Sequence, residues 1–252
     1  MHRFYVPSDQ AHDPVLKLSE RETHHAVHVL RVRSGERVVA LDGAGHEFMG
    51  ETRSTEERVL GITVLQKTWI PPLPYQMTLI QAVPKGKTME LIVQKATELG
   101  AHRFVPMLSE RTVPHIEEES AAGKMEKWRA TAIESIKQCG SAWLPRIEAP
   151  RSPGGFLAEG DKFDLVLIAT LQSDRKHPRE HIRDFVADRG RMPRSVAVWV
   201  GPEGDFTPAE INAARSGGAL PITLGPLVLR SETAAIYCLS VLGYELQAPE
   251  SA

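Results

Sequence analysis

The chain has 252 residues, of which 42% are hydrophobic and 25% charged, and its formal net charge is −2. This composition is typical of a globular protein with a sizeable core. The net charge excludes attraction of nucleic acid by the protein as a whole, so any contact with RNA or DNA must use a local basic patch. Cys139 and Cys238 are not part of a CxxC motif and indicate a reducing compartment without a disulfide framework. No apolar run predicts a signal peptide or a membrane span, so we expect a cytoplasmic protein with no membrane association.

Short strand patterns fill the first part of the chain. Residues 36–43, 46–53 and 58–66 are β-rich runs separated by glycine or charged residues. The three prolines of TWIPPLPYQ (68–76) then forbid a regular helix and mark a boundary. The sequence therefore predicts a small, mostly β module over residues 1–72.

The stretch ETHHAVHVLRVRSGE (22–36) is rich in histidine and arginine. His24 and His28 have the spacing of a metal-binding helix, but His25 stands where a zincin motif has glutamate, and no cysteine lies nearby. We therefore expect no metal. One interpretation is a local RNA-facing edge of imidazoles and guanidiniums, and the other is a structural helix whose histidines are satisfied internally.

Strands and helices alternate after the boundary, over residues 73–252. Apolar strand patterns occur at 77–83, 103–108, 163–170, 195–200 and 220–225. Helical patterns occur at 87–100, 124–140, 178–188, 208–216 and 231–246, and Gly100 fits the position just after the first helix. This alternation predicts an α/β module with a parallel sheet that is covered on both faces.

The segment AVPKGKTME (82–90) contains GKT, but it is not a P-loop. That motif needs a glycine where this chain has Gln81, so a nucleoside triphosphatase is excluded. We interpret the segment as a basic loop that opens a helix, with Thr88 as a candidate N-cap. Lys85 and Lys87 are candidate phosphate contacts on that loop.

A glycine-bearing loop, VGPEGDFTPAE (200–210), follows one predicted strand directly. Thr207 reads as an N-cap, Pro208 as the first helical residue and Glu210 as the partner that completes a capping box. Such a loop lies at the carboxyl end of a parallel strand, where open α/β sheets bind ligands. Glycine there lets a ligand approach the backbone, although a plain turn explains the same residues.

A second loop, LGPLVLRSETAAIYC (224–238), repeats this arrangement. Ser231 is its predicted N-cap, and Arg230 lies at the mouth of the last helix. Two such loops at strand ends of one sheet predict a shared pocket. A nicotinamide-dependent oxidoreductase is disfavoured, because the chain has no GxGxxG fingerprint.

These blocks together resemble the bacterial 16S rRNA (uracil-N3)-methyltransferases of the SPOUT superfamily. The similarity covers nearly the whole chain and includes RFYV, HHAVHVLRVRSGE, PKGKTMELIVQKATELG on to FVPMLSERTV, VGPEGDFTPAE and LGPLVLRSETAA, in the family's order. It implies an α/β protein with a PUA-like β-barrel, which binds RNA, at 1–72. A methyltransferase domain with a C-terminal trefoil knot would follow at 73–252.

The resemblance also implies a homodimer that acts on 16S rRNA of the small ribosomal subunit. In the family each knot packs on its partner, and the apolar residues of the last helix suit that contact, although a plain core also explains them. These residues are Ile236, Leu239, Val241 and Leu242.

S-adenosylmethionine is the cofactor that the family resemblance implies. The residues carried over for its binding are Leu171, Gly201, Gly204, Leu224, Gly225, Leu229 and Arg230. Uracil N3 must lose a proton before it attacks the methyl group, so a base or a stabilising cation is expected. We predict that Arg230 stabilises the developing anion, and that Glu232 or Glu203 takes the proton unless these acids only cap a helix or orient a neighbour.

RNA contacts are also carried over from the family. The residues are Arg3, His25, Arg31, Arg33, Lys85 and Lys87. Two departures from the family's pattern put local RNA or dimer contacts in doubt: the run Lys137-Gln138-Cys139-Gly140-Ser141 replaces an E-Q-S-x-R-like patch, and Asp205 follows Gly204 where the family usually reads GPEGG. Two alternatives stay open. One is a different methylation, at another RNA position or on ribose 2′-O instead of base N3, and the other is a non-enzymatic RNA-binding protein of ribosome assembly.

Overall fold

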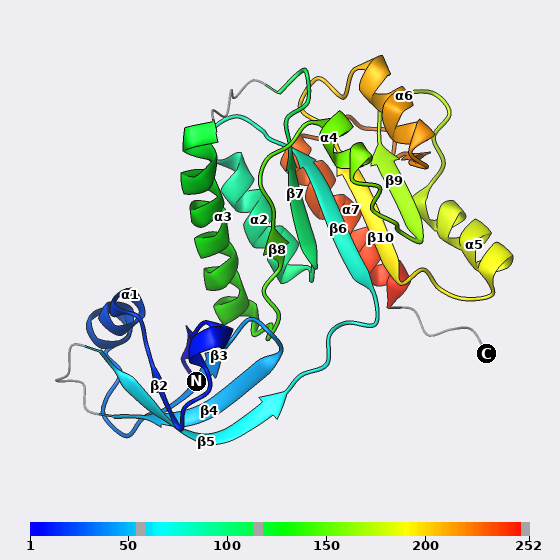
Figure 1. Cartoon of the computed structure of the whole chain (residues 1–252). Helices are drawn as coiled ribbons and strands as arrows, with labels where there is room; N and C mark the ends of the chain where they lie inside the picture. The colour runs from blue at the N-terminus through cyan, green and yellow to red at the C-terminus, as the bar shows by residue number, and fades with distance from the viewer. Residues whose placement is uncertain (54–58, 113–117, 248–252) are drawn as a thin grey trace. The chain divides into compact units, whose positions relative to one another are not determined.

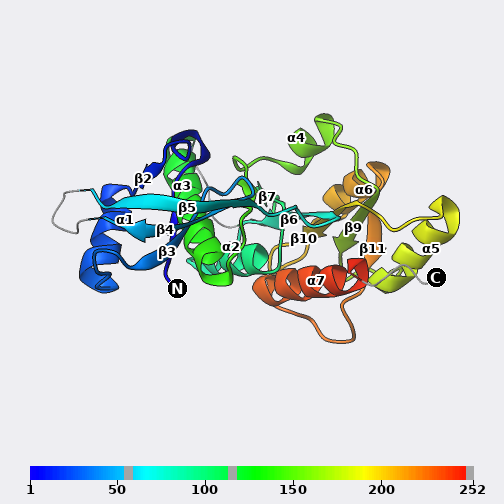
Figure 2. The same cartoon turned by 90° about the horizontal axis from the view of Figure 1, so that it is seen from below.

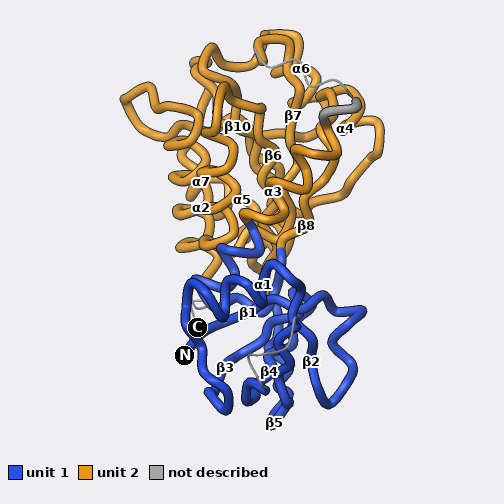
Figure 3. Tube along the Cα trace, turned by 90° about the vertical axis from the view of Figure 1, so that its left-hand side faces the viewer, with its two compact units in different colours: residues 1–72, 132–144 blue, residues 73–131, 145–252 orange. Residues whose placement is uncertain are grey.

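The computed structural model describes residues 1–53, 59–112 and 118–247 (Figure 1). The chain divides into two compact units (Figure 3). Unit 1 comprises Met1–Pro72 and Ala132–Leu144, and unit 2 comprises Leu73–Thr131 and Pro145–Ala252. Unit 1 thus combines two separate stretches of the sequence, because the long helix α3 (Glu118–Cys139) contributes residues to both units.

Unit 1 is built on a five-stranded mixed sheet. Its spatial order is β1 (Arg3–Tyr5), β3 (Arg37–Leu41), β4 (His46–Thr52), β5 (Gly61–Trp69) and β2 (Val15–Lys17). β1 runs parallel to β3, and the other pairs are antiparallel. The predicted barrel is a half-barrel, because the edge strands β1 and β2 do not pair with each other in the described part of the chain.

A helical turn carries the histidine-rich stretch of unit 1. The 3-10 turn η1 (Ser8–Gln10) precedes it. α1 (Glu20–His24) is capped by Ser19, whose Oγ accepts from the Glu22 N–H at 3.2 Å, and continues as the π-helix η2 (His25–Val29). π-helical turns are rare and are often found at functional sites.

Unit 2 contains a parallel sheet, as predicted, but it has six strands and not the five that the sequence patterns indicated. Its spatial order is β11 (Leu220–Ile222), β9 (Leu165–Ala169), β10 (Ser195–Val200), β6 (Gln76–Ala82), β7 (Arg103–Met107) and β8 (Arg146–Ile147). All of its strand pairs are parallel. Strands buried on both faces explain the uninterrupted apolar runs in their sequences.

Helices cover both faces of this sheet (Figure 2). α2 (Thr88–Glu98) and α7 (Ser231–Leu246) pack together on one face, and α5 (Pro178–Arg189) packs against α7 and β9. α4 (Pro153–Ala158) and α6 (Pro208–Ser216) cover the other face. Side chains of α4, α6 and four strands form one core there, which includes Ile80, Val105, Phe156, Trp199, Phe206 and Ile211. No described helix is long and apolar enough to cross a membrane.

The helix ends test the predicted caps. The Thr207–Glu210 capping box is present, and Gly100 follows α2 with a left-handed φ of 79°, as predicted. The predictions of Thr88 and Ser231 as N-caps are wrong. Lys87, not Thr88, is the N-cap of α2 and makes no side-chain capping bond. Ser231 is the first residue of α7 and Arg230 its N-cap, because the Ser231 hydroxyl is bound elsewhere.

Candidate functional site

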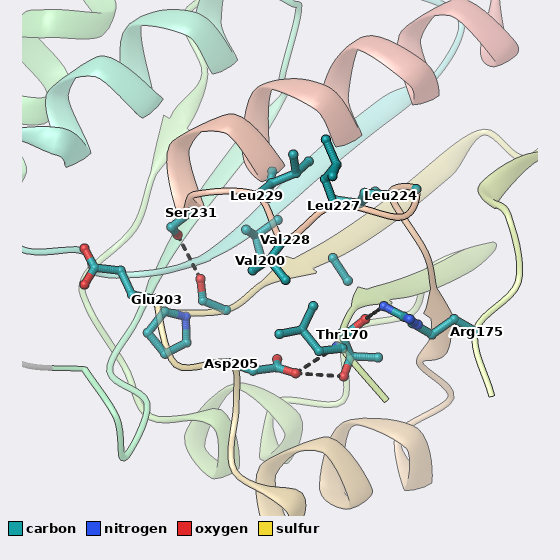
Figure 4. Close-up of a pocket in the computed structure, with 16 residues that line it drawn as sticks. Thr170, Arg175, Val200, Glu203, Asp205, Leu224, Leu227, Val228, Leu229 and Ser231 are labelled. Carbon is teal, nitrogen blue, oxygen red and sulfur yellow. Dashed lines mark hydrogen bonds between the residues drawn. The ribbon is translucent and has the colours of Figure 1, made fainter. Parts of the chain in front are cut away.

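A pocket lies at the carboxyl ends of β9 and β10, beside the start of α7 (Figure 4). Three loops form its walls, and all belong to unit 2. The first follows β9, the second follows β10 and the third precedes α7. About 560 Å³ of space free of protein atoms, partly open to solvent, lies between them. The carboxyl ends of neighbouring strands are where parallel sheets bind ligands.

The second loop makes a tight turn whose first glycine lies close against the core. The Asp205 N–H donates to the Pro202 carbonyl oxygen at 3.0 Å and closes the turn. A Cβ atom at Gly201 would lie 3.2 Å from the Phe206 ring, which packs edge-on against Trp199. The turn is therefore held against the core, and its backbone lines the pocket.

Hydrogen bonds of Ser231 anchor the start of α7 to this second loop and to β6. The Ser231 hydroxyl donates to the Gly201 carbonyl oxygen at 2.8 Å (Figure 4). It also accepts from the Gln81 amide at 2.8 Å. Gln81 is fully buried on β6, and its Oε1 has no hydrogen-bond partner among the described residues. Ser231 thus fixes two walls of the pocket relative to each other.

The pocket lining combines aliphatic side chains with few charges. Its charged residues are Arg175, Glu203 and Asp205. Leu227 and Val228 on the third loop are 75% and 73% exposed, so the rim is apolar and uncovered. Apolar walls suit a flat heteroaromatic ring, and carboxylates suit a cationic group beside it. Within the described ranges no three His, Cys, Asp or Glu side chains are grouped to hold a metal ion.

The structure gathers most of the predicted cofactor residues at this pocket. Those that line it are Leu171, Gly201, Leu224, Gly225 and Leu229. Gly204 and Arg230, the other two, do not line it; the Gly204 carbonyl oxygen accepts from the Arg111 guanidinium at 2.6 Å.

The two predicted catalytic residues lie just outside the pocket. Arg230 is exposed at the start of α7, and Glu232 is half-buried in its first turn. Glu203, the alternative base, does line the pocket. Sequence reasoning missed Arg175 and Ser231 as lining residues. The position of Ser231 at a helix start could have indicated its place at the pocket. No sequence pattern around Arg175 indicates a ligand site.

The predicted RNA-binding residues lie in several places. In unit 1, Arg31 and Arg33 are exposed just after η2, and His25 is half-buried within it. Arg3 donates to the carbonyl oxygens of Lys137 and Gln138, at 3.4 and 3.5 Å, and so satisfies the carboxyl end of α3. In unit 2, Lys85 and Lys87 are exposed on the loop between β6 and α2.

The histidine pair that the metal hypothesis singled out is a ring contact. The His24 and His28 rings are 4.7 Å apart, between centroids, and tilted by 43°. Both side chains are exposed on the surface of unit 1. The pair is therefore an exposed aromatic contact on the α1–η2 turn of unit 1.

Family models match both parts of the chain. Residues 71–243 match an RNA methyltransferase domain, and residues 18–54 match an RNA methyltransferase PUA domain. Ribosomal RNA small subunit methyltransferase E of Bacillus subtilis is 30% identical over 237 residues, which cover 93% of this chain and 91% of that protein. The Mycobacterium tuberculosis protein of the same name is 30% identical over 240 residues, covering 95% and 90%.

Two solved structures of similar proteins contain bound S-adenosylmethionine. A putative methyltransferase from Legionella pneumophila has a TM-score of 0.88 at 32% identity and covers 97% of this chain and 98% of its own. Ribosomal RNA small subunit methyltransferase E from Neisseria gonorrhoeae has a TM-score of 0.83 at 26% identity, with coverage of 97% and 98%.

Proposed function

This chain belongs to the ribosomal RNA small subunit methyltransferase E family, and we propose that it methylates N3 of a uridine in 16S rRNA of the small ribosomal subunit. S-adenosylmethionine is the methyl donor, as the similar structures with this molecule support. The observation that carries the proposal is the pocket where the β9, β10 and α7 loops meet. It lies within residues that match the RNA methyltransferase domain.

The pocket residues fit this cofactor. Aliphatic side chains and backbone groups of Leu171, Gly201, Leu224, Gly225 and Leu229 would hold its adenosine part. The exposed carboxylate of Glu203 gives the pocket a negative charge that suits a sulfonium and an ammonium group. The bound cofactor supplies an activated methyl group, so the protein's main task is to position the reactants.

Arg230 and an acid carry the remaining chemistry in this proposal. Arg230 would stabilise negative charge that develops on the uracil ring oxygens when N3 loses its proton. Glu203 and Glu232 are both candidate bases. Glu203 is exposed and lines the pocket, whereas Glu232 lies in the first turn of α7, where a carboxylate also interacts favourably with the helix dipole.

The target uridine must be unpaired or extruded, because N3 is hidden in a base pair. We propose that Arg31 and Arg33 of unit 1 contact the surrounding RNA and that Lys85 and Lys87 of unit 2 contact phosphates. A homodimer and the C-terminal trefoil knot are further proposals, and both come from the family resemblance. No ordinary topology rule would suggest a knot.

The test uses small ribosomal subunits from a strain that lacks this gene. The purified protein and S-adenosylmethionine are added, the RNA is digested, and 3-methyluridine is measured by mass spectrometry. Its appearance, absent in a control without protein, supports the proposal. A different methylated nucleotide would overturn the N3 assignment. Failure to bind the cofactor would favour an assembly protein without methyltransferase activity.

A further inference from the structure

Asp205 adopts a backbone conformation that L-residues rarely adopt. Its φ is 59°, and the only other non-glycine residue with a positive φ in the described ranges is Arg31. A left-handed φ is disfavoured for a residue with a Cβ atom, and such strain persists where the surroundings hold it in place. The contacts of the Asp205 side chain show what holds it.

The Asp205 carboxylate links two walls of the pocket. Its Oδ2 accepts from the Leu171 N–H at 2.9 Å and from the Thr170 hydroxyl at 3.1 Å (Figure 4). Its Oδ1 accepts from the Phe206 N–H at 2.8 Å, within its own loop. One side chain on the loop after β10 thus holds the loop after β9.

With these bonds, all polar groups around the Thr170–Leu171 peptide are hydrogen-bonded. The Thr170 carbonyl oxygen accepts from the Arg175 guanidinium at 3.1 Å. The Thr170 N–H donates to the Ile222 carbonyl oxygen at 3.5 Å, on the neighbouring strand β11. Every polar group from the Thr170 N–H to the Leu171 N–H therefore has a partner. What this wall presents to the pocket is the Leu171 side chain, which is 52% exposed.

We propose that Asp205 is a positioning residue for the methyl donor. Its carboxylate locks the Thr170–Leu171 wall against the loop after β10, so that the pocket is formed before the cofactor arrives. A preformed wall removes the ordering cost from binding and so increases affinity. The inference rests on the proposed function of this pocket, and it assigns Asp205 no role in the transfer of the methyl group.

Replacement of Asp205 by glycine separates this role from a purely structural one. Glycine adopts the left-handed φ freely, so Asp205→Gly removes the carboxylate without adding strain. Asp205→Asn keeps one acceptor oxygen, and asparagine tolerates this conformation better than most residues. Thr170→Val removes only the hydroxyl donor from the other wall. Asp174→Asn is the matched control, because Asp174 lies in the same loop as Leu171 but pairs with the exposed Arg215 instead.

The first measurement is the Kd of S-adenosylmethionine, and of its demethylated product, by calorimetry. We expect Asp205→Gly to weaken binding at least about tenfold, since charge-assisted hydrogen bonds are lost. Asp205→Asn should recover part of that loss. Thr170→Val should be intermediate and add little to Asp205→Gly, and Asp174→Asn should bind like the wild type. For Asp205→Gly, steady-state kinetics should show a raised KM for the cofactor and an unchanged kcat at saturating cofactor.

Hydrogen exchange of the cofactor-free protein is the readout that a structural role would not reproduce. The Leu171 amide should exchange faster in Asp205→Gly, while β9 and β10 keep their protection. Wild-type affinity in both Asp205→Gly and Thr170→Val would overturn the inference, as would loss of protection throughout the sheet. If the wild type itself does not bind the cofactor, the proposed function fails; if it binds and the variants match it, only the role of Asp205 fails.

Discussion

Arg230 is the exposed cation nearest in sequence to the start of α7. Its guanidinium has no ion pair or hydrogen bond to any other described residue, so its charge is available to a ligand. We expect Arg230→Ala to lower kcat about 10²- to 10³-fold, the effect of removing one donor to a developing anion. The Kd of S-adenosylmethionine should not change, because Arg230 does not line the pocket. Rapid-quench kinetics and calorimetry check both, with Arg230→Lys intermediate; unchanged turnover would contradict this role.

Lys137 is buried in unit 1, where the family pattern differs from this chain. Its Nζ lies 2.7 Å from a Glu22 oxygen and 2.9 Å from a Glu134 oxygen, and the Lys137 and Glu22 side chains are 6% and 8% exposed. Lys137→Ala leaves the Glu22 charge buried without its partner, so we expect it to lower the free energy of unfolding by about 3–5 kcal/mol. Lys137→Ala with Glu22→Gln should recover part of the loss. Urea denaturation checks this, and a loss below about 1 kcal/mol, the size typical of an exposed ion pair, would contradict it.

At the scale of elements, Asp164 joins the starts of β9 and β10. Its carboxylate accepts two bonds from the Arg191 guanidinium, at 2.8 and 2.7 Å, and one from the Arg194 N–H at 2.7 Å. The hydrogen bonds from Arg191 are the largest cause that holds the pKa of Asp164 well below its ordinary value, against a smaller effect of burial.

A lowered carboxyl pKa makes the stability of this link depend on pH. The folded protein holds the Asp164 proton less tightly than the unfolded chain, so the stabilisation is present above the ordinary Asp pKa of about 3.9 and is lost as the pH falls towards the folded value. Asp164→Asn should therefore be less stable than the wild type at pH 7, and the difference should shrink below about pH 4. Thermal unfolding of both proteins across this range checks it. A difference that does not vary with pH would contradict it.

Local patterns predicted the long elements of unit 2 well. The predicted and observed bounds agree for β10, α6 and α7, because each combines an apolar period with clear ends. β1, β2 and β8 have two or three residues each, too few to show a period. The Ser231 cap was mispredicted because its hydroxyl binds Gly201, which no local pattern reveals. Glycine loops likewise indicated the pocket, whereas the link between Asp205 and Thr170 appears only in the folded chain.

The division of the whole molecule shows the same limit. The prolines near Pro72 mark where unit 1 ends in its first stretch. Its second stretch, residues 132–144, begins in the middle of the continuous helix α3, where the sequence carries no boundary signal. Ala132 and Ile136 of that stretch are fully buried. Deletion of residues 1–70 would remove most of unit 1 and leave the remainder without its sheet. Point substitutions therefore test the RNA-binding role of unit 1 more cleanly than truncation.

The proposed homodimer has a candidate surface on α7. Leu239 and Leu242 are buried, contrary to their suggested use at an interface, whereas Ile236 and Val241 line a groove with the exposed Tyr237 and Tyr244. We expect the wild type to sediment as a dimer and Ile236→Asp as a monomer, because burial of an unpaired carboxylate is costly.

The control for this prediction is Leu91→Asp, which places the same charge at an exposed leucine of α2. It should leave the dimer intact. Thermal unfolding separates dissociation from loss of the fold in Ile236→Asp. A folded, dimeric Ile236→Asp protein would show that this groove is not the interface.

RNA affinity should depend on the unpaired arginines of unit 1. Arg31 and Arg33 have no side-chain ion pair within the described ranges, and Arg31 is held in the left-handed conformation at the end of η2. Each phosphate contact releases counterions, so the double substitution Arg31→Ala, Arg33→Ala should reduce the log–log salt slope by up to about 0.7 per lost contact on single-stranded RNA. Binding should weaken most at low salt.

Fluorescence anisotropy with a labelled rRNA fragment, measured across a salt series, checks this prediction. The matched control is Arg37→Ala in the same unit, because Arg37 already lies 3.6 Å from a Glu51 oxygen. The Kd of S-adenosylmethionine should be unchanged in both variants, since the pocket residues all belong to unit 2. If the salt slope does not change, Lys85 and Lys87 become the contacts to test, and the basic stretch after η2 is then a structural feature of unit 1.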